Sequence, residues 1–385
     1  MVKEKKPKKK FGWRQFFPIV LMMLVGGMCG YYAVGIIDSL SYVERSKGGT
    51  ICSIAALFIE IYLAFYLQII LHEAGHWLFG RMTGYRFSSF RIGSFMWMIR
   101  NGKIRLCRLK LVGMGGQCLM SPPEMRDGRI PYILYNMGGS LMNCISAAVF
   151  AGIALLTRTT PLVFSFFVLL AGIGIVFALM NGIPMRFDTL NNDGYNALAL
   201  GKDSEALRSF WIQLKINESC AKGIRIKDMP EEWFTMPSPE AMKNSMIAAL
   251  GVFACNRMLD EMKFDDASRA MRELLEMNSG IVGLYCSMLT ADLIYCELIG
   301  ENRQKTLEEL LDRKQNKFMK AMKSYPPVLR TQYAYALLKE KNTAKAERLK
   351  LTFEKVAKKY PYPSDIAGER ELMAFAEREY SAFSA

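Results

Sequence analysis

Four long apolar segments divide the first half of the chain, and charged residues gather between and around them. The segments are Phe16–Ile37, Ile51–Phe79, Pro131–Leu156 and Pro161–Met180. A helix needs about 20 apolar residues to cross the hydrocarbon core of a bilayer, and each segment is about that long or longer. The pattern therefore predicts about four transmembrane helices.

A basic segment between the second and third apolar segments has a different, alternating pattern. Within Arg81–Ile130, apolar residues largely alternate with polar ones over Phe95–Leu111, and Asn101-Gly102 interrupts the alternation. This arrangement is the strongest short-range signal for a β-hairpin. We expect a small membrane-associated β-hairpin. It lies on the membrane, pairs its edge with an extended substrate, or does both, because the two roles are compatible. The glycine-rich stretch Gly113–Gly116 lets the following loop turn or approach another group closely.

From about Lys202 onward the apolar positions recur with the spacing of amphipathic helices. Turn signals follow one another at Lys263-Phe264-Asp265, Gly300-Glu301-Asn302 and Lys341-Asn342, about 38 to 40 residues apart. A period of this length is typical of stacked helix pairs, as in tetratricopeptide repeats. We therefore predict a soluble α-helical repeat domain that is similar to degenerate tetratricopeptide repeats and binds a cytoplasmic protein partner or serves a structural role.

Composition agrees with a membrane half joined to a soluble half. The chain has 385 residues, of which 51% are hydrophobic and 22% are charged. The predicted fold class is an all-α membrane protein with the hairpin as its only sheet element. The predicted domains are a basic cytoplasmic tail over residues 1–14, a transmembrane domain over 15–200 and a cytoplasmic α-helical repeat domain over 201–385.

The net charge of +14 helps to predict the topology. Nearly all of the excess lies before Gly194, in the lysine-rich N-terminal tail and in the loops between the apolar segments. Because cytoplasmic loops of membrane proteins are enriched in lysine and arginine, we expect a multi-pass protein of the cell membrane with both termini in the cytoplasm. No basic patch interleaved with aromatic residues occurs in the soluble half, so a nucleic-acid partner is not expected. The nine cysteines are scattered and include no C-x-x-C pair, which favours reduced thiols over a secreted disulfide framework.

The candidate chemistry lies at the end of the second apolar segment, where the only two histidines of the chain occur as His72-Glu73-Ala74-Gly75-His76. Residues four apart share one face of a helix, so both imidazoles can reach one metal ion while Glu73 serves as a general base. Ionisable groups are costly in a membrane helix and usually functional. Gln68 lies one turn earlier on roughly the same face, whereas Glu60 is expected to lie off it. A catalytic zinc ion needs a third protein ligand from another segment.

Two aspartates after the fourth apolar segment, Asp188 and Asp193, are candidates for that third ligand. With Asn181-x-x-Pro184 and Asp193-Gly194, the first 200 residues resemble the site-2-protease family of intramembrane zinc metalloproteases. The resemblance implies that His72, His76 and Asp193 bind one Zn²⁺, that Glu73 is the general base and that Asn181 holds the substrate or stabilises the oxyanion. The family places its aspartate about eight residues after the asparagine. Here Asp193 follows after twelve and Asp188 after seven, and the glycine after Asp193 favours it.

These features predict a zinc-dependent intramembrane endopeptidase that cleaves a membrane protein or membrane-bound peptide near the cytoplasmic side, in regulated intramembrane proteolysis or in signal or leader peptide processing. One alternative is a catalytically silent membrane scaffold that binds a partner through its helical repeats. A second alternative is a metallopeptidase that is anchored by its helices and acts on soluble substrates.

Overall fold

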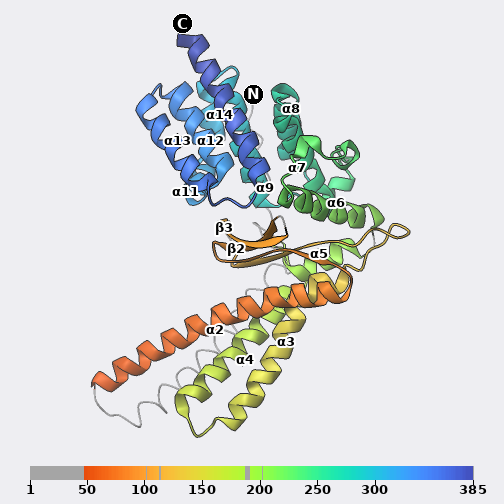
Figure 1. Cartoon of the computed structure of the whole chain (residues 1–385), viewed down its shortest axis with the longest axis vertical. Coiled ribbons are helices and arrows are strands. Elements are labelled where there is room, and N and C mark those ends of the chain that lie inside the picture. Colours follow the sequence, from red (N-terminus) through yellow and green to blue (C-terminus); the bar gives the residue numbers. More distant parts are fainter. Residues whose placement is uncertain (1–46, 101, 112–113, 187–190, 202, 385) are drawn as a thin grey trace, which may run out of the picture. The chain divides into compact units, whose positions relative to one another are not determined.

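The computed structural model describes residues 47–100, 102–111, 114–186, 191–201 and 203–384. The basic tail over residues 1–14 and the first predicted span, Phe16–Ile37, lie outside the described residues. The described chain is mostly helical with a small antiparallel sheet (Figure 1), and it divides into two compact units. One unit comprises Met1–His72 and Gly139–Met185, and the other comprises Glu73–Gly138 and Arg186–Ala385.

Three of the predicted apolar segments form helices that are long and apolar enough to cross a membrane. They are α2 (Lys47–Met82), α3 (Ile133–Leu156) and α4 (Pro161–Gly182). These helices leave large apolar side chains exposed, such as Phe58, Val149 and Leu162. At the same time they bury polar side chains. This distribution is the reverse of that in a water-soluble bundle and matches hydrocarbon as the surrounding solvent.

The predicted hairpin is confirmed, but it is only half of the sheet. Strands β2 (Phe95–Arg100) and β3 (Lys103–Arg108) pair antiparallel around Gly102, whose φ of +72° suits a tight turn. Two further strands, β1 (Arg86–Ile92) and β4 (Gly116–Ser121), extend it in the order β3-β2-β1-β4. Within the described residues β4 pairs on one side only, with β1, so it is an edge strand.

One face of the hairpin is packed and the other is open. Met96, Met98 and Cys107 are buried on the packed face, and helix α6 (Ser204–Ala221) contacts β2 and β4. Met120 of β4 is also buried, but the register places it on the same face as Trp97. The open face of the hairpin carries exposed apolar side chains, which are Phe95, Trp97, Ile99, Ile104 and Leu106. An apolar patch of this kind is consistent with the amphipathic hairpin expected from the alternation.

The chain after residue 190 is built from short helices. They are α5 (Asp193–Leu200), α6, α7 (Ser245–Asp260), α8 (Phe264–Glu276), α9 (Gly283–Ile299), α10 (Gln304–Leu310), α11 (Arg313–Ala321), α12 (Pro326–Ala334), the π-helical turn η4 (Tyr335–Lys339), α13 (Thr343–Ala357) and α14 (Pro363–Ser384). Three short 3₁₀ turns, η1 (Ile226–Asp228), η2 (Glu231–Trp233) and η3 (Ala241–Lys243), connect α6 to α7. Neighbouring helices pack in chain order from α6 to α9, and α12 contacts α9, α13 and α14.

Three turns between these helices have the same backbone conformation. Met262, Asn302 and Lys341 have φ values of 60°, 51° and 51° and lie 40 and 39 residues apart. Met262 directly precedes the first predicted turn, and Asn302 and Lys341 lie in the other two. Residues other than glycine adopt this left-handed conformation only in tight turns. The three residues lie at nearly equal spacing along the chain.

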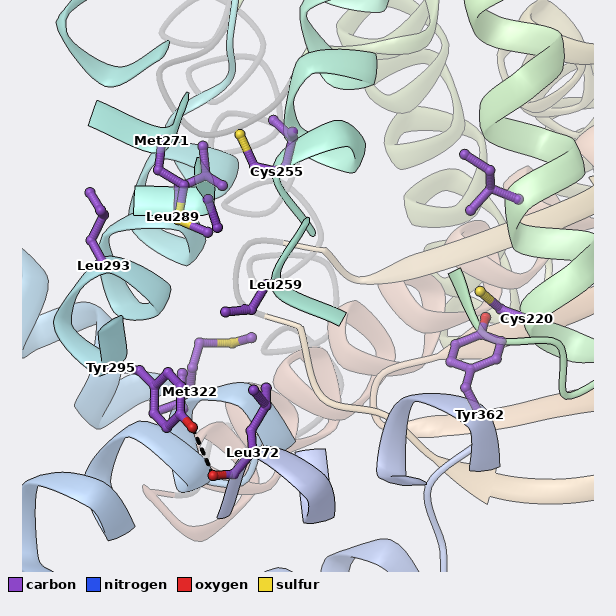
Figure 2. Close-up of a cluster of buried hydrophobic side chains, with 14 of the residues drawn as sticks. Cys220, Cys255, Leu259, Met271, Leu289, Leu293, Tyr295, Met322, Tyr362 and Leu372 are labelled. Atoms are coloured by element: carbon purple, nitrogen blue, oxygen red, sulfur yellow. Dashed lines mark hydrogen bonds between the residues drawn. The ribbon is translucent and has the colours of Figure 1, made fainter. Parts of the chain in front are cut away.

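The interior of the helical region is a continuous apolar cluster. Figure 2 shows side chains of several helices meeting there, among them Cys255, Met271, Leu289 and Leu293. The Tyr295 hydroxyl in this cluster donates a hydrogen bond of 2.7 Å to the Leu372 carbonyl oxygen (Figure 2). Because each buried Leu or Met contributes roughly 1.5–3 kcal/mol, this cluster is the main source of stability for the region.

Candidate metal centre

His72, Glu73 and His76 lie on helix α2, which continues without a break through Met82. All three side chains are buried, with exposed fractions of 8%, 7% and 8%. The four-residue step between the histidines is a step along one helix, so both imidazoles face the same side. Buried ionisable groups on an otherwise apolar helix are costly, so partners must hold them in place.

The His76 ring is fixed by a backbone carbonyl. His76 Nδ1 lies 2.7 Å from the Tyr135 carbonyl oxygen. A carbonyl oxygen can only accept, so Nδ1 carries the proton and the lone pair of the ring lies on Nε2. That Nε2 atom lies 3.3 Å from Asp193 Oδ2. Tyr135 is in turn held by its hydroxyl, which donates to the Cys118 carbonyl oxygen at 2.9 Å, and by stacking on Tyr85.

The His72 ring is fixed by a chain of side-chain amides. Asn143 Nδ2 donates to Gln68 Oε1 at 2.8 Å, and Gln68 Nε2 donates to the Leu170 carbonyl oxygen at 2.8 Å. These bonds turn Asn143 Oδ1 toward His72 Nδ1, 2.6 Å away. The acceptor oxygen places the proton on Nδ1 and again leaves Nε2 with the lone pair. Ser146 adds a hydroxyl donor to Gln68 Oε1 at 3.2 Å.

Asp193 begins helix α5, where the Asn192 side chain caps the helix by accepting from Tyr195 N at 2.9 Å. One ligand atom from each of His72, His76 and Asp193 lies within 4.8 Å of the other two. Two imidazole nitrogens and one carboxylate oxygen are the donor set of a catalytic zinc site. Oxygen acceptors on the second ring nitrogens are also typical of metal-binding histidines. The residues present therefore fit the metal that the motif predicts. The other aspartate, Asp188, lies outside the described residues.

Two glycines allow close approach to these side chains. A methyl group at Gly139 of α3 would overlap the His72 ring. A methyl group at Gly116, the first residue of β4, would lie 2.5 Å from Glu73 Oε1. Glycine is therefore required at both positions if the imidazole and the carboxylate are to keep their places. The Gly116 contact also shows that the edge strand β4 begins beside the candidate general base.

A buried arginine holds the loop that leads into β4. Arg91 is fully buried, and its guanidinium donates to the carbonyl oxygens of Gly93, Met114 and Gly116 at 2.7, 3.4 and 3.3 Å. Burial lowers the pKa of Arg91, and the negative charge of Glu73 opposes that shift. The guanidinium thus orders the start of β4 and adds a positive charge near the carboxylate.

Two polar residues from the sequence prediction have other contacts. Asn181 Nδ2 donates to the Phe177 carbonyl oxygen, one turn earlier on α4, at 3.0 Å, and its role at the substrate carbonyl stays a prediction. Glu60 was expected to lie off the motif face, and its carboxylate accepts from the Ser165 hydroxyl at 2.8 Å.

The sequence prediction did not include Asn143, Tyr135 or Arg91. In the stretch around Gly138, Gly139 and Asn143, the small residues favour helix packing. Packing is indeed one of its roles, because a methyl group at Gly138 would lie 2.7 Å from the Gly75 carbonyl oxygen of α2. An asparagine inside an apolar span was a signal for a buried polar partner. The contacts of Tyr135 and Arg91 use backbone carbonyl oxygens, which no sequence pattern marks.

Comparisons with known proteins give one match. A search of curated proteins and a search of solved structures each return no match. The matched segment, residues 60–162, includes the two histidines and the sheet, and it ends before Asn181, Asp193 and the helices that follow. The family model that matches residues 60–162 is that of peptidase family M50, the site-2-protease family, so the family predicted from the motif is confirmed over this segment and the chain is supported as a membrane metalloprotease.

Proposed function

We propose that this protein is a zinc-dependent intramembrane endopeptidase that cleaves a membrane protein or membrane-bound peptide near the cytoplasmic side. The observation that carries the proposal is the pair formed by His76 Nε2 and Asp193 Oδ2 at 3.3 Å, beside a second histidine whose ring is held in the same tautomer. His72, His76 and Asp193 would hold one zinc ion, which when bound supplies a Lewis acid and lowers the pKa of water to about 7.

Glu73 is the group that moves protons in this proposal. Its carboxylate accepts a proton from the water that attacks the scissile carbonyl carbon, and it then passes that proton to the leaving amine as the C–N bond breaks. Burial of Glu73 against β4 keeps bulk water away from the carboxylate. Asn181 is assigned to the substrate carbonyl, where an amide N–H stabilises negative charge on oxygen. That role requires its side chain to leave the Phe177 carbonyl oxygen when substrate binds.

A transmembrane substrate hides its peptide bonds in helical hydrogen bonds, so it must unwind before it is cleaved. The sheet offers a replacement set of partners at the edge of β4, which starts beside Glu73. We assign substrate pairing to this edge, by strand addition. The expected substrate edge on the Phe95–Leu111 hairpin is thereby moved to the opposite edge of the same sheet.

The finer architecture belongs to the same proposal. Four spans, including Phe16–Ile37, would place both termini in the cytoplasm, in agreement with the basic loops. Residues 15–200 would form the protease domain, and residues 201–385 a cytoplasmic domain of tetratricopeptide-like helix pairs. The left-handed turn residues Met262, Asn302 and Lys341 support the repeat by their equal spacing. Such a domain would bring a partner or part of the substrate to the protease.

The test is a comparison of membrane peptide fragments in cells that carry the wild-type protein or the Glu73→Gln variant. Fragments that end within a transmembrane segment should appear only with the wild type. Replacing the span of an identified substrate with a soluble linker should abolish its cleavage, and continued cleavage would favour the anchored soluble-substrate peptidase. Identical fragments with Glu73→Gln would instead favour the scaffold that binds a partner and does not cleave.

A further inference from the structure

A large cavity lies within the second compact unit, between the sheet and the helical region. Its volume is about 460 Å³, within the range of sites that bind small ligands or several side chains of a peptide. Helices α6, α7, α9, α12 and α14 contribute to its walls, and so does the segment that leads into and through β4. Leu259, Tyr362 and Leu372, which Figure 2 shows in the neighbouring apolar cluster, belong to the lining.

The lining carries more negative than positive charge. Its carboxylates are Asp260, Asp292, Asp365 and Glu369, and its guanidinium groups are Arg225 and Arg330. Arg225 pairs with Asp260 at 2.6 Å, and Arg330 pairs with Asp292 at 2.5 Å and with Glu369 at 2.9 Å. Asp365 has only a distant hydroxyl donor, Ser364 Oγ at 3.4 Å, and a bond from Tyr360, and no cation pairs with it among the described residues. When all of these groups are ionised, the cavity has two uncompensated negative charges.

The rest of the lining suits a peptide. Tyr285, Tyr325, Tyr360 and Phe253 contribute aromatic rings, and leucine and methionine side chains also belong to the lining. Aromatic rings next to carboxylates bind the methylene stems of lysine or arginine and attract their charged ends. A surrounding of this kind favours a cationic chain segment over a neutral apolar ligand, because the carboxylates need a partner once water is excluded.

The cavity borders strand β4, which begins beside Glu73. Met114, Gln117 and Leu119 line it, and Gly116, which lies between the first two in sequence, lies against Glu73. A substrate strand paired along the edge of β4 would therefore run beside both Glu73 and the residues that line the cavity. Transmembrane segments are commonly flanked on the cytoplasmic side by lysine and arginine. The charge of the cavity is complementary to that flank.

We propose that this cavity binds the basic segment that flanks the cleaved span of the substrate on its cytoplasmic side, with Asp365 accepting a lysine or arginine side chain. This inference rests on the proposed protease function and adds a recognition site to it. The helical region would then select substrates by the charge of the flanking segment. Strand β4 would hold the adjoining substrate residues beside Glu73.

The experiment measures peptide binding without cleavage. Full-length Glu73→Gln protein in detergent is titrated against a fluorescein-labelled dodecapeptide with four lysines in a background of alanine, leucine and serine, and anisotropy is recorded. A second peptide has glutamine in place of each lysine. Because the protein carries a net charge of +14, non-specific attraction of the lysine peptide is disfavoured. We expect the lysine peptide to bind at least about tenfold more tightly than the glutamine peptide.

Variants locate the binding. Asp365→Asn should weaken binding of the lysine peptide about fivefold or more, because it removes a negative charge from the lining. Asn256→Lys should weaken binding by a similar factor, because it adds a cation to the lining. The matched control is Asp266→Asn, an aspartate of α8 that is outside the lining, 57% exposed and expected to leave binding unchanged. Equal binding of both peptides, or unchanged binding in folded Asp365→Asn and Asn256→Lys proteins, would overturn the recognition site. Since no cleavage is measured, that result would leave the proposed protease function standing.

Discussion

The apolar helices α2, α3 and α4 differ from the helices after residue 203 in the side chains that they expose and in the polar groups that they bury. In the first group Phe58 and Leu162 are exposed, while Gln68 and Asn143 are completely buried. In the second group leucines and methionines fill the interior and charged residues cover the surface. Apolar side chains gain little from burial when the surrounding solvent is lipid. The buried polar groups of α2 and α3 therefore indicate function, whereas the buried apolar groups of the later helices indicate stability.

The helices after residue 203 also bury a charged network, in which Arg330 is fully buried and pairs with two carboxylates. Burial raises the pKa values of Asp292 and Glu369, and the positive charge of Arg330 opposes both shifts. Arg330 also lies over the Tyr295 ring, with its Cζ atom 4.4 Å from the ring centre. This network joins α9, α12 and α14, so it has a structural role independent of metal chemistry.

Glu73→Gln should have the largest effect on activity. Removing a general base lowers the rate typically 10²- to 10⁴-fold, so cleavage of a reconstituted membrane substrate should fall by about that factor. The amide keeps the shape of the side chain against Gly116, so zinc content and thermal unfolding temperature should stay at wild-type values. Retained cleavage would contradict the assignment of polar groups on α2 to function.

Arg330→Met should have the largest effect on stability. The change leaves Asp292 and Glu369 buried without their cation, which typically costs about 3–5 kcal/mol. Thermal unfolding in detergent should show a lower midpoint, while protein that remains folded should keep its zinc. The matched control is Lys345→Met, because Lys345 pairs with Glu340 on the surface and should contribute less than about 1 kcal/mol. Similar unfolding midpoints for the two variants would argue against the buried network.

Gly139→Ala should weaken zinc binding. The added methyl group must displace the His72 ring from its bond to Asn143, and such disturbances typically cost 10- to 100-fold in metal affinity. Gly152→Ala, on the same helix, meets nothing within 4 Å and serves as the control. Competition with a zinc chelator measures both affinities, and equal values would show that the His72 ring does not bind the ion.

Asp365→Asn should change the pH dependence of stability. Burial, followed by the charges of Glu369 and Asp260, raises the pKa of Asp365 from 3.8 to about 7. The folded state therefore holds this proton more tightly than the unfolded chain, so the stabilisation is complete below about pH 4 and is lost as the pH rises through about 7.

The difference in unfolding free energy between wild type and Asp365→Asn should thus change by at most about 1.4 kcal/mol per pH unit between pH 4 and 7, with the wild type losing stability relative to the variant as the pH rises. Urea unfolding at several pH values measures this difference. Parallel profiles would show that Asp365 is not held in a buried, uncompensated position.

Much of this architecture was predictable because it follows from local patterns. Apolar length predicted α2, α3 and α4, and alternation around Asn101-Gly102 predicted the β2–β3 hairpin. Strands β1 and β4 were not predicted. Strand β1 has a buried arginine at position 91, and strand β4 begins with a glycine. Neither strand therefore shows the simple alternation of apolar and polar residues that is typical of a half-buried strand. Their pairing is a long-range property of the chain.

The candidate site was predictable only in part for a similar reason. A helix places His72 and His76 on one face by periodicity alone. The contacts of His76 with the Tyr135 carbonyl oxygen and with Asp193 join segments that are 59 and 117 residues away in sequence, and no local rule predicts them. The choice between Asp188 and Asp193 rested on the glycine that follows Asp193.

The central claim, that His72, His76 and Asp193 bind one zinc ion, is tested most directly by the zinc content of purified full-length protein in three forms. Elemental analysis should find one zinc ion per chain in the wild type and in Asp188→Asn, and a large loss in Asp193→Asn. Zinc retained in Asp193→Asn, or lost in Asp188→Asn instead, would contradict it.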